Sequence, residues 1–161
     1  MAASPGIGDP VDDFSLPGGT WDGDTFHRAE FRLSDRRGAP LVLAYYPGDA
    51  TPVCTAQLCS YNDGLADLTR AGGAVWGISP QGLDSHADFA RARDLRMPLL
   101  ADTDRVVAKG LGITAPLIGV RRSVFIVDAE GRLAWRHVTA VGLTYPKPEV
   151  IAARLAALAE A

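Results

Sequence analysis

Cys54 and Cys59 are the residues whose type and spacing most directly indicate chemistry in this chain. They are its only cysteines, and they lie five positions apart, shortly after the apolar run 41–46. Pro47 ends that run, and Thr51 stands three residues before Cys54. At the start of a helix, unpaired backbone N–H groups and the positive end of the dipole stabilise a thiolate. We therefore expect Cys54 to be a nucleophile at neutral pH.

Thr51 and Pro47 have properties that suit the same pocket. Thr51 can donate its hydroxyl to an incoming oxygen while accepting from a backbone amide, or it can serve only as the N-cap of the helix. Pro47 stiffens the loop, brings no backbone donor and can shield the thiolate from water. Together with Cys54 they form a candidate catalytic corner.

The spacing of the two cysteines limits how they can pair. In an ideal helix, residues five apart are separated by about 140° in azimuth and by roughly 8–9 Å between Cα atoms. This exceeds the limit of roughly 7 Å for a disulfide. If both cysteines are helical, the first turns must unwind before they can pair, which predicts a reduced helical state and an oxidised, locally unfolded one. Cys59 can also be a helix residue that takes no part while Cys54 works alone.

The elements that must position this corner alternate between strands and helices. Apolar runs predict strands at 41–46, 74–79, 98–101 and 123–127, and a hairpin that continues into 132–138. Helical periodicity predicts helices at 51–71 with a weak point near Gly64, from Asp84 or Ser85 onward, at 106–111 and at 149–158. An arm at 1–13, a short strand at 14–16, a turn at 17–19 and a strand or irregular segment at 25–33 come first. The order predicts an α/β sandwich with Cys54 beyond the carboxyl end of a central strand, where such sheets place their sites.

Length and composition narrow the class of protein. The chain of 161 residues is expected to form a single domain, 1–161, with a core of ordinary size. Its net charge of −3 gives no reason to expect nucleic acid or a membrane surface as partner. No signal-peptide pattern or membrane-length apolar run is present, so a cytoplasmic location is expected. There, a close cysteine pair is more often catalytic or redox-sensing than structural.

A metal site is the weaker interpretation of the cysteine pair. A closed zinc site needs about four ligands, and the three histidines, His27, His86 and His137, lie far apart in the sequence. We expect no metal and no organic cofactor. His86 is expected to start a helix without taking part in chemistry.

Pro47, Thr51 and Cys54 fit the pattern Pro-x-x-x-Thr-x-x-Cys, and through it the stretch resembles the peroxiredoxin family. Cys59 is similar to the second cysteine of the Q-type subfamily, also called the bacterioferritin-comigratory group. The likeness continues in order through segments 76–80, 85–89, 99–102, 107–113 and 122–128, so that it covers nearly the whole chain.

The resemblance implies a thioredoxin-like fold, with a central mixed sheet flanked by helices and an N-terminal extension. It also implies a thiol peroxidase that reduces hydrogen peroxide and organic hydroperoxides. Cys54 would be the peroxidatic cysteine, Arg122 the arginine that holds thiolate and peroxide, with Arg121 as the neighbouring alternative. Cys59 would resolve the sulfenic acid as an intrachain disulfide, which thioredoxin or another dithiol would reduce. A monomer is sufficient for this cycle, and a weak homodimer is equally compatible.

The chain departs from the family at Gln57, where many members of the subfamily have glutamate. It also lacks the Gly-Gly-Leu-Gly loop and Tyr-Phe tail of the peroxide-sensitive subgroup. A redox sensor or chaperone-like binding protein that uses the same cysteine pair is the alternative function. A thioredoxin-like disulfide oxidoreductase is disfavoured, because its motif has two residues between the cysteines and this one has four.

Overall fold

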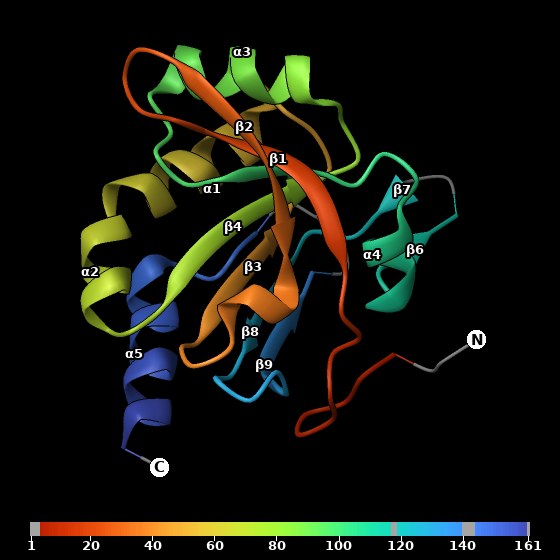
Figure 1. The fold of residues 1–161 in the computed structure, drawn as a ribbon, viewed down its shortest axis with the longest axis vertical. Coiled ribbons are helices and arrows are strands. Elements are labelled where there is room, and N and C mark those ends of the chain that lie inside the picture. Colours follow the sequence, from red (N-terminus) through yellow and green to blue (C-terminus); the bar gives the residue numbers. More distant parts are fainter. Residues whose placement is uncertain (1–3, 117–118, 140–143, 161) are drawn as a thin grey trace.

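A seven-stranded mixed sheet forms the centre of the structure, a computed structural model that describes residues 4–116, 119–139 and 144–160 (Figure 1). The strand order is β2-β1-β5-β4-β3-β8-β9. The strands are β1 (Ser15–Trp21), β2 (Phe26–Arg32), β3 (Leu41–Tyr45), β4 (Ala74–Ser79), β5 (Leu99–Ala101), β8 (Ser123–Val127) and β9 (Leu133–Val138). The expected central mixed sheet flanked by helices is therefore confirmed.

In the described part of the chain, five α-helices and a short 3₁₀ helix surround the sheet (Figure 1). They are η1 (Leu33–Arg36), α1 (Pro52–Asp63), α2 (Leu65–Arg70), α3 (Leu83–Arg93), α4 (Val106–Gly110) and α5 (Pro148–Ala159). The break between α1 and α2 falls at Gly64, where the sequence predicted a weak point. A small second sheet of β6 (Thr114–Ala115) and β7 (Gly119–Val120) was not expected from the sequence. No helix in the described ranges has the length and apolar character needed to cross a membrane.

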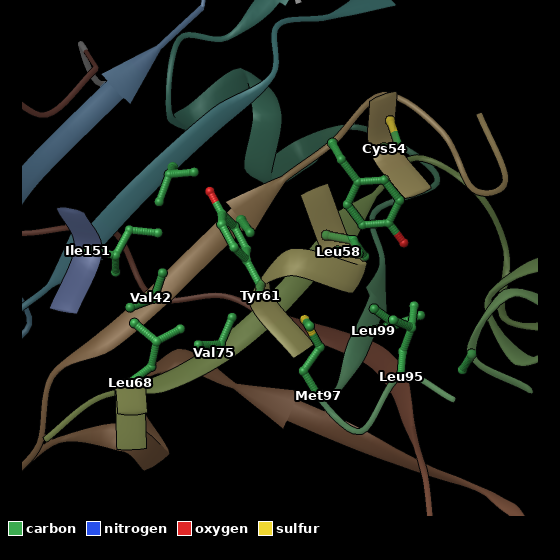
Figure 2. Packing of buried hydrophobic residues seen from close by; sticks show 14 of the residues in the cluster. Val42, Cys54, Leu58, Tyr61, Leu68, Val75, Leu95, Met97, Leu99 and Ile151 are labelled. Atoms are coloured by element: carbon green, nitrogen blue, oxygen red, sulfur yellow. The ribbon is translucent and has the colours of Figure 1, made fainter. Parts of the chain in front are cut away.

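Strand β3 divides the core into two clusters because its side chains alternate between the faces of the sheet. Val42, Ala44 and Tyr46 point to the side covered by α1, α2, α3 and α5. Leu41 and Leu43 point to the side covered by α4 and η1. Every residue of β3 is buried, as its continuous apolar sequence predicted. In Figure 2 side chains of α1 lie over β3 and β4 in the first of these clusters.

The pairing of β3 with its neighbours brings distant segments to one edge of the sheet. β3 runs parallel to β4, and Tyr45 pairs with Ile78 at their carboxyl ends. β8 runs antiparallel to β3, so that Ser123, its first residue, pairs with Tyr45. The start of β8 therefore lies beside the end of β3, where the loop leading to Cys54 begins.

The prediction of a turn at 17–19 is wrong. Strand β1 continues from Ser15 to Trp21 and pairs with β2 along its full length. Gly18 and Gly19 are required there by close packing. An added Cβ would lie 2.8 Å from the ring of Phe31 at Gly18 and 2.2 Å from the ring of Phe26 at Gly19. The two glycines make room for aromatic rings of the neighbouring strand and do not mark a change of direction.

The residues before β1 form an arm that bonds to the start of β9. The amide of Gly8 donates to the carbonyl oxygen of Leu133, and that of Leu133 donates to Asp9. This is the N-terminal extension that the resemblance implied. The first three residues of the expected arm lie outside the described part of the chain.

Candidate active site

Cys54 lies in the first turn of α1, directly after the loop that follows β3. The helix begins at Pro52, and Thr51 occupies the N-cap position with extended backbone angles (φ −74°, ψ 152°). Proline suits the first helical position because its missing N–H would have no partner there. Cys54 is the third helical residue and its side chain is buried, with 1% of its surface exposed. The thiol therefore sits among the amides that lack helical acceptors.

Arg122 contacts the thiol directly. Its Nη2 atom donates to the Sγ atom of Cys54 over 3.0 Å, and the arginine is itself only 3% exposed. Arg122 comes immediately before β8, and the antiparallel register of β8 with β3 brings it to the corner from 68 residues away. A guanidinium at this distance can make a charge-assisted hydrogen bond to a sulfur anion.

Gln57 holds the other arm of the guanidinium, a role that the sequence analysis did not assign. The Nη1 atom of Arg122 donates to the Oε1 atom of Gln57, whose side chain is fully buried. Gln57 lies three residues after Cys54 on α1, so both side chains face the same way. The i, i+3 spacing was the available signal in the sequence. The acceptor for this arm of Arg122 is thus an amide oxygen, which carries no charge.

The contact continues from Gln57 into the protein interior. The Nε2 atom of Gln57 donates to the hydroxyl of Tyr61 over 3.4 Å, and that hydroxyl donates to the carbonyl oxygen of Pro146 over 2.7 Å. Burial raises the pKa of Tyr61 above its ordinary value, so the phenol keeps its proton and remains a donor. Figure 2 shows Tyr61 further along α1 than Cys54, among core side chains such as Val42. The position of Arg122 is therefore fixed by a chain of buried hydrogen bonds.

Thr51 and Pro47 lie in the exposed part of the loop. The hydroxyl of Thr51 donates to the carbonyl oxygen of Gly48 over 3.1 Å, and α1 has no side-chain hydrogen bond at its N-cap. Because the N-cap of α1 has no side-chain hydrogen bond, the expectation that this hydroxyl accepts from a backbone amide of the helix is wrong. Pro47 directly follows the buried Tyr46 and is exposed.

The two arginines that the sequence left as alternatives occupy different positions. Arg121 is half-exposed, and its backbone amide donates to the carbonyl oxygen of Ile113. Arg122 is the one whose guanidinium reaches Cys54. Both arginines directly precede β8, and only Arg122 is buried.

Cys59 is a separate, half-buried thiol on the same helix. Both cysteines are free, and both lie within the uninterrupted helix α1. They are therefore not close enough for a disulfide in this state, as their spacing predicted. Burial raises the pKa of Cys59, and the nearby Arg93 opposes this increase.

The described residues offer no group of three or more His, Cys, Asp or Glu side chains that could hold a metal ion. The reactive groups gathered at the corner are a thiol, a guanidinium and backbone amides. This arrangement can stabilise a sulfur nucleophile and the negative charge that develops on an oxygen under attack.

A profile of the AhpC/TSA family matches residues 7–136. A Mycobacterium tuberculosis protein described as a peroxiredoxin is 38% identical over 84% of this chain and 87% of its own length. Peroxiredoxin Bcp of Bacillus subtilis is 30% identical over 82% of this chain and 85% of its own. Both likenesses span the corner and the segment that contains Arg122.

Solved structures agree with these sequence relatives. The peroxidoxin BcpB of Mycobacterium tuberculosis has a TM-score of 0.77 at 27% identity, covering 97% of each chain. Peroxiredoxin Q of Xanthomonas campestris has a TM-score of 0.71 at 26% identity, covering 90% of each chain. The fold is thus the thioredoxin-like fold that the sequence resemblance implied.

Proposed function

The chain belongs to the AhpC/TSA family and is a thiol-dependent peroxidase of the peroxiredoxin Q (Bcp) type, and on this premise we propose that Cys54 is its peroxidatic cysteine. The observation that supports the assignment best is the 3.0 Å contact from Arg122 to a buried thiol in the first turn of α1. Cys59 is half-buried on the same helix, and burial raises its pKa.

In the first step the thiolate of Cys54 attacks the terminal oxygen of a hydroperoxide and breaks the O–O bond. The sulfur gains that oxygen as a sulfenic acid, and the leaving oxygen takes up a proton to become water or an alcohol. Arg122 and the backbone amides of Val53 and Cys54 stabilise the charge that develops on the oxygens. Thr51 donates its hydroxyl to the peroxide after leaving Gly48.

In the second step Cys59 resolves the sulfenic acid. Its thiolate attacks the sulfur of Cys54, a disulfide forms, and the sulfenic oxygen leaves as water after protonation. Because both thiols lie within α1, the helix must open at its first turns before the sulfur atoms can meet. Both cysteines belong to one chain, so a monomer suffices, although a weak homodimer would serve equally.

An external dithiol completes the cycle. A thiolate of thioredoxin or a similar protein attacks the disulfide, and its second thiol releases reduced Cys54 and Cys59. This fits a cytoplasmic enzyme with hydrogen peroxide or organic hydroperoxides as oxidant.

The test is peroxide consumption in the presence of a recycling dithiol, followed in a stopped-flow instrument. Cys54→Ser should be inactive, and retained activity would refute the assignment of Cys54. After one equivalent of peroxide, non-reducing mass analysis of the wild type should show the loss of two hydrogen atoms. A lasting sulfenic acid would instead show that Cys59 does not resolve it. Oxidation without turnover, accompanied by a stable partner complex, would favour the sensor over the enzyme.

A further inference from the structure

Asp49 anchors the loop between β3 and α1 to helix α3 through a buried cluster. Its Oδ1 atom accepts from the hydroxyl of Tyr46 over 2.6 Å. Its Oδ2 atom accepts from the hydroxyl of Ser85 over 2.7 Å and lies 2.6 Å from the Nδ1 atom of His86. The side chains of Asp49 and His86 are 3% and 0% exposed. A carboxyl group with three partners, five residues before Cys54, is thus shielded from water.

The hydrogen positions in this cluster follow from the partners of His86. Its Nε2 atom lies 2.9 Å from the carbonyl oxygen of Leu100, which can only accept, so Nε2 carries a hydrogen atom. The Nδ1 atom faces the Oδ2 atom of Asp49 at hydrogen-bond distance. Burial, and next the charge of Asp49, raise the pKa of Tyr46 well above its ordinary value, so its phenol remains a donor. Each contact is therefore a satisfied hydrogen bond.

The loop that this cluster holds has an unfavourable backbone conformation. Ala50, between Asp49 and Thr51, has a φ of 63°, in the left-handed region that non-glycine residues avoid. The backbone amide of Asp49 also donates to the side chain of Gln81, in the segment that precedes α3. A strained residue persists only where its surroundings hold it, and here the holding contacts come from Tyr46 at the end of β3, from α3 and from the segment before α3.

We propose that Asp49, Tyr46, Ser85 and His86, here named the Asp49 clasp, are positioning residues that control how readily the first turns of α1 open. The clasp joins the loop that carries Thr51 and leads into Cys54 to the end of β3 and to α3. If the hydrogen bonds of the clasp are lost, the loop is no longer held against α3. The first turn of α1 then lacks a fixed N-terminal neighbour and opens more readily. This inference rests on the proposed resolution of Cys54 by Cys59.

The clasp would decide between two fates of the Cys54 sulfenic acid. Condensation with Cys59 gives a disulfide and water and requires α1 to open. Reaction with a second hydroperoxide transfers another oxygen to sulfur, giving a sulfinic acid and water or alcohol, and requires no opening. A weaker clasp therefore favours the disulfide, and a stronger one favours loss of enzyme to the sulfinic acid.

If the clasp residues only stabilised the fold, their replacement would not specifically change the division of the sulfenic acid between disulfide and sulfinic acid. A buried carboxyl–imidazole contact can contribute to global stability without any particular effect on α1. The matched control is Leu33→Ala, which creates a cavity in the core cluster on the other face of the sheet. This change lowers global stability but does not touch the loop.

The experiment compares Asp49→Ala, Ser85→Ala and Leu33→Ala with the wild type. Reduced protein is mixed with hydrogen peroxide, quenched at intervals and analysed by mass for sulfenic acid, disulfide and sulfinic acid. Asp49→Ala should accelerate disulfide formation about tenfold, the change expected if the three contacts of Asp49 together hold the loop by about 1.4 kcal/mol. Ser85→Ala removes one bond and should accelerate disulfide formation less. Asp49→Ala and Ser85→Ala should both lower the fraction of sulfinic acid at excess peroxide. Leu33→Ala should leave the ratio of disulfide to sulfinic acid unchanged.

The proposal would be overturned if Asp49→Ala and Leu33→Ala changed the ratio of disulfide to sulfinic acid equally, or if neither clasp variant changed it. If Asp49→Ala does not fold, Ser85→Ala decides the question alone. Hydrogen exchange of reduced protein supplies a readout that needs no Cys59 chemistry, because clasp variants should speed exchange in 48–58 and Leu33→Ala should not. If the wild type forms no disulfide, the proposed resolution fails, whereas unchanged exchange in the clasp variants refutes the clasp.

Discussion

Gln57 is expected to act on Cys54 only through Arg122, and a double-mutant cycle can test this. The guanidinium donates with one arm to the sulfur over 3.0 Å and with the other to the buried amide oxygen of Gln57. Replacing Arg122 by methionine removes both bonds while keeping an apolar stem of similar length. Replacing Gln57 by methionine leaves the arginine present but releases its second arm.

The expected magnitudes follow from the two contacts. A hydrogen bond from a charged group contributes about 1.5–3 kcal/mol, so we take about 2 kcal/mol for the contact of Arg122 with the sulfur. This corresponds to about a 30-fold slower oxidation of Cys54 in Arg122→Met. Loss of the orienting bond in Gln57→Met should amount to about 1 kcal/mol, or about fivefold. The double variant should be about 30-fold slower, since without Arg122 the amide has nothing to orient.

The assay measures the rate of single oxygen addition to Cys54 by rapid mixing with hydrogen peroxide, acid quenching and mass analysis. Ala56→Met is the control, because it puts the same side chain on the exposed face of the same helix and should leave the rate unchanged. If the double variant is slowed by the product of the single effects, about 160-fold, the two side chains act independently. The account of Gln57 as the holder of Arg122 would then be wrong.

Three further outcomes are expected. Because burial raises the pKa of Cys59 above its ordinary value, disulfide formation should accelerate as pH rises through the alkaline range, and a flat profile in quenched-flow mass analysis would contradict this. Hydrogen bonds from Thr25 and His27 lower the pKa of Asp22 from 3.8 to about 2, so its stabilising contribution is present above 3.8 and lost as pH falls toward about 2. Thermal melts of Asp22→Asn across that range should show a weaker acid dependence than the wild type. Leu43→Ala, at a fully buried site on the face away from Cys54, should lower the free energy of unfolding in urea by about 2–5 kcal/mol without slowing Cys54 oxidation.

Much of this structure could be predicted because the relevant signals are local or periodic. The run 41–46 is apolar at every position, and β3 is buried at every residue. Gly64 interrupts a helical repeat, and the helix breaks there. The cysteine at the start of a helix was predictable from the end of the apolar run at Pro47 and from the helical periodicity that follows it. These features depend on neighbours within a few residues, which a sequence displays directly.

The wrong predictions concern residues whose partners lie far away in the chain. Gly18 and Gly19 indicated a turn, but they make room for rings of β2. Asp84 or Ser85 was predicted to cap α3, yet Gly82 occupies the N-cap position without any side-chain cap, and Ser85 donates to Asp49 instead. Turn and cap preferences describe isolated segments, and here tertiary packing overrides them.

His86 shows most clearly what a single sequence conceals. His86 was expected to start a helix without taking part in chemistry, and the sequence did not predict that it would be fully buried between Asp49 and Leu100. Nothing local distinguishes it from His27, which is exposed and bonds to Asp22 nearby. The contact between His86 and Asp49 depends on the parallel pairing of β4 with β3, which places the start of α3 beside the loop between β3 and α1.

The loop and first turn around Cys54 are therefore held from two sides by contacts of different kinds. On one side Arg122 bonds directly to the sulfur and Gln57 holds Arg122, so this pair acts on the reaction with peroxide. On the other side Asp49 and His86 hold the loop and make no bond to the sulfur, so they act on its mobility. Variants of the first pair should change the rate of the first oxygen transfer, and variants of the second should change the division of the sulfenic acid between disulfide and sulfinic acid. The separation of these effects arises from the topology, since β8 supplies one side and α3 the other.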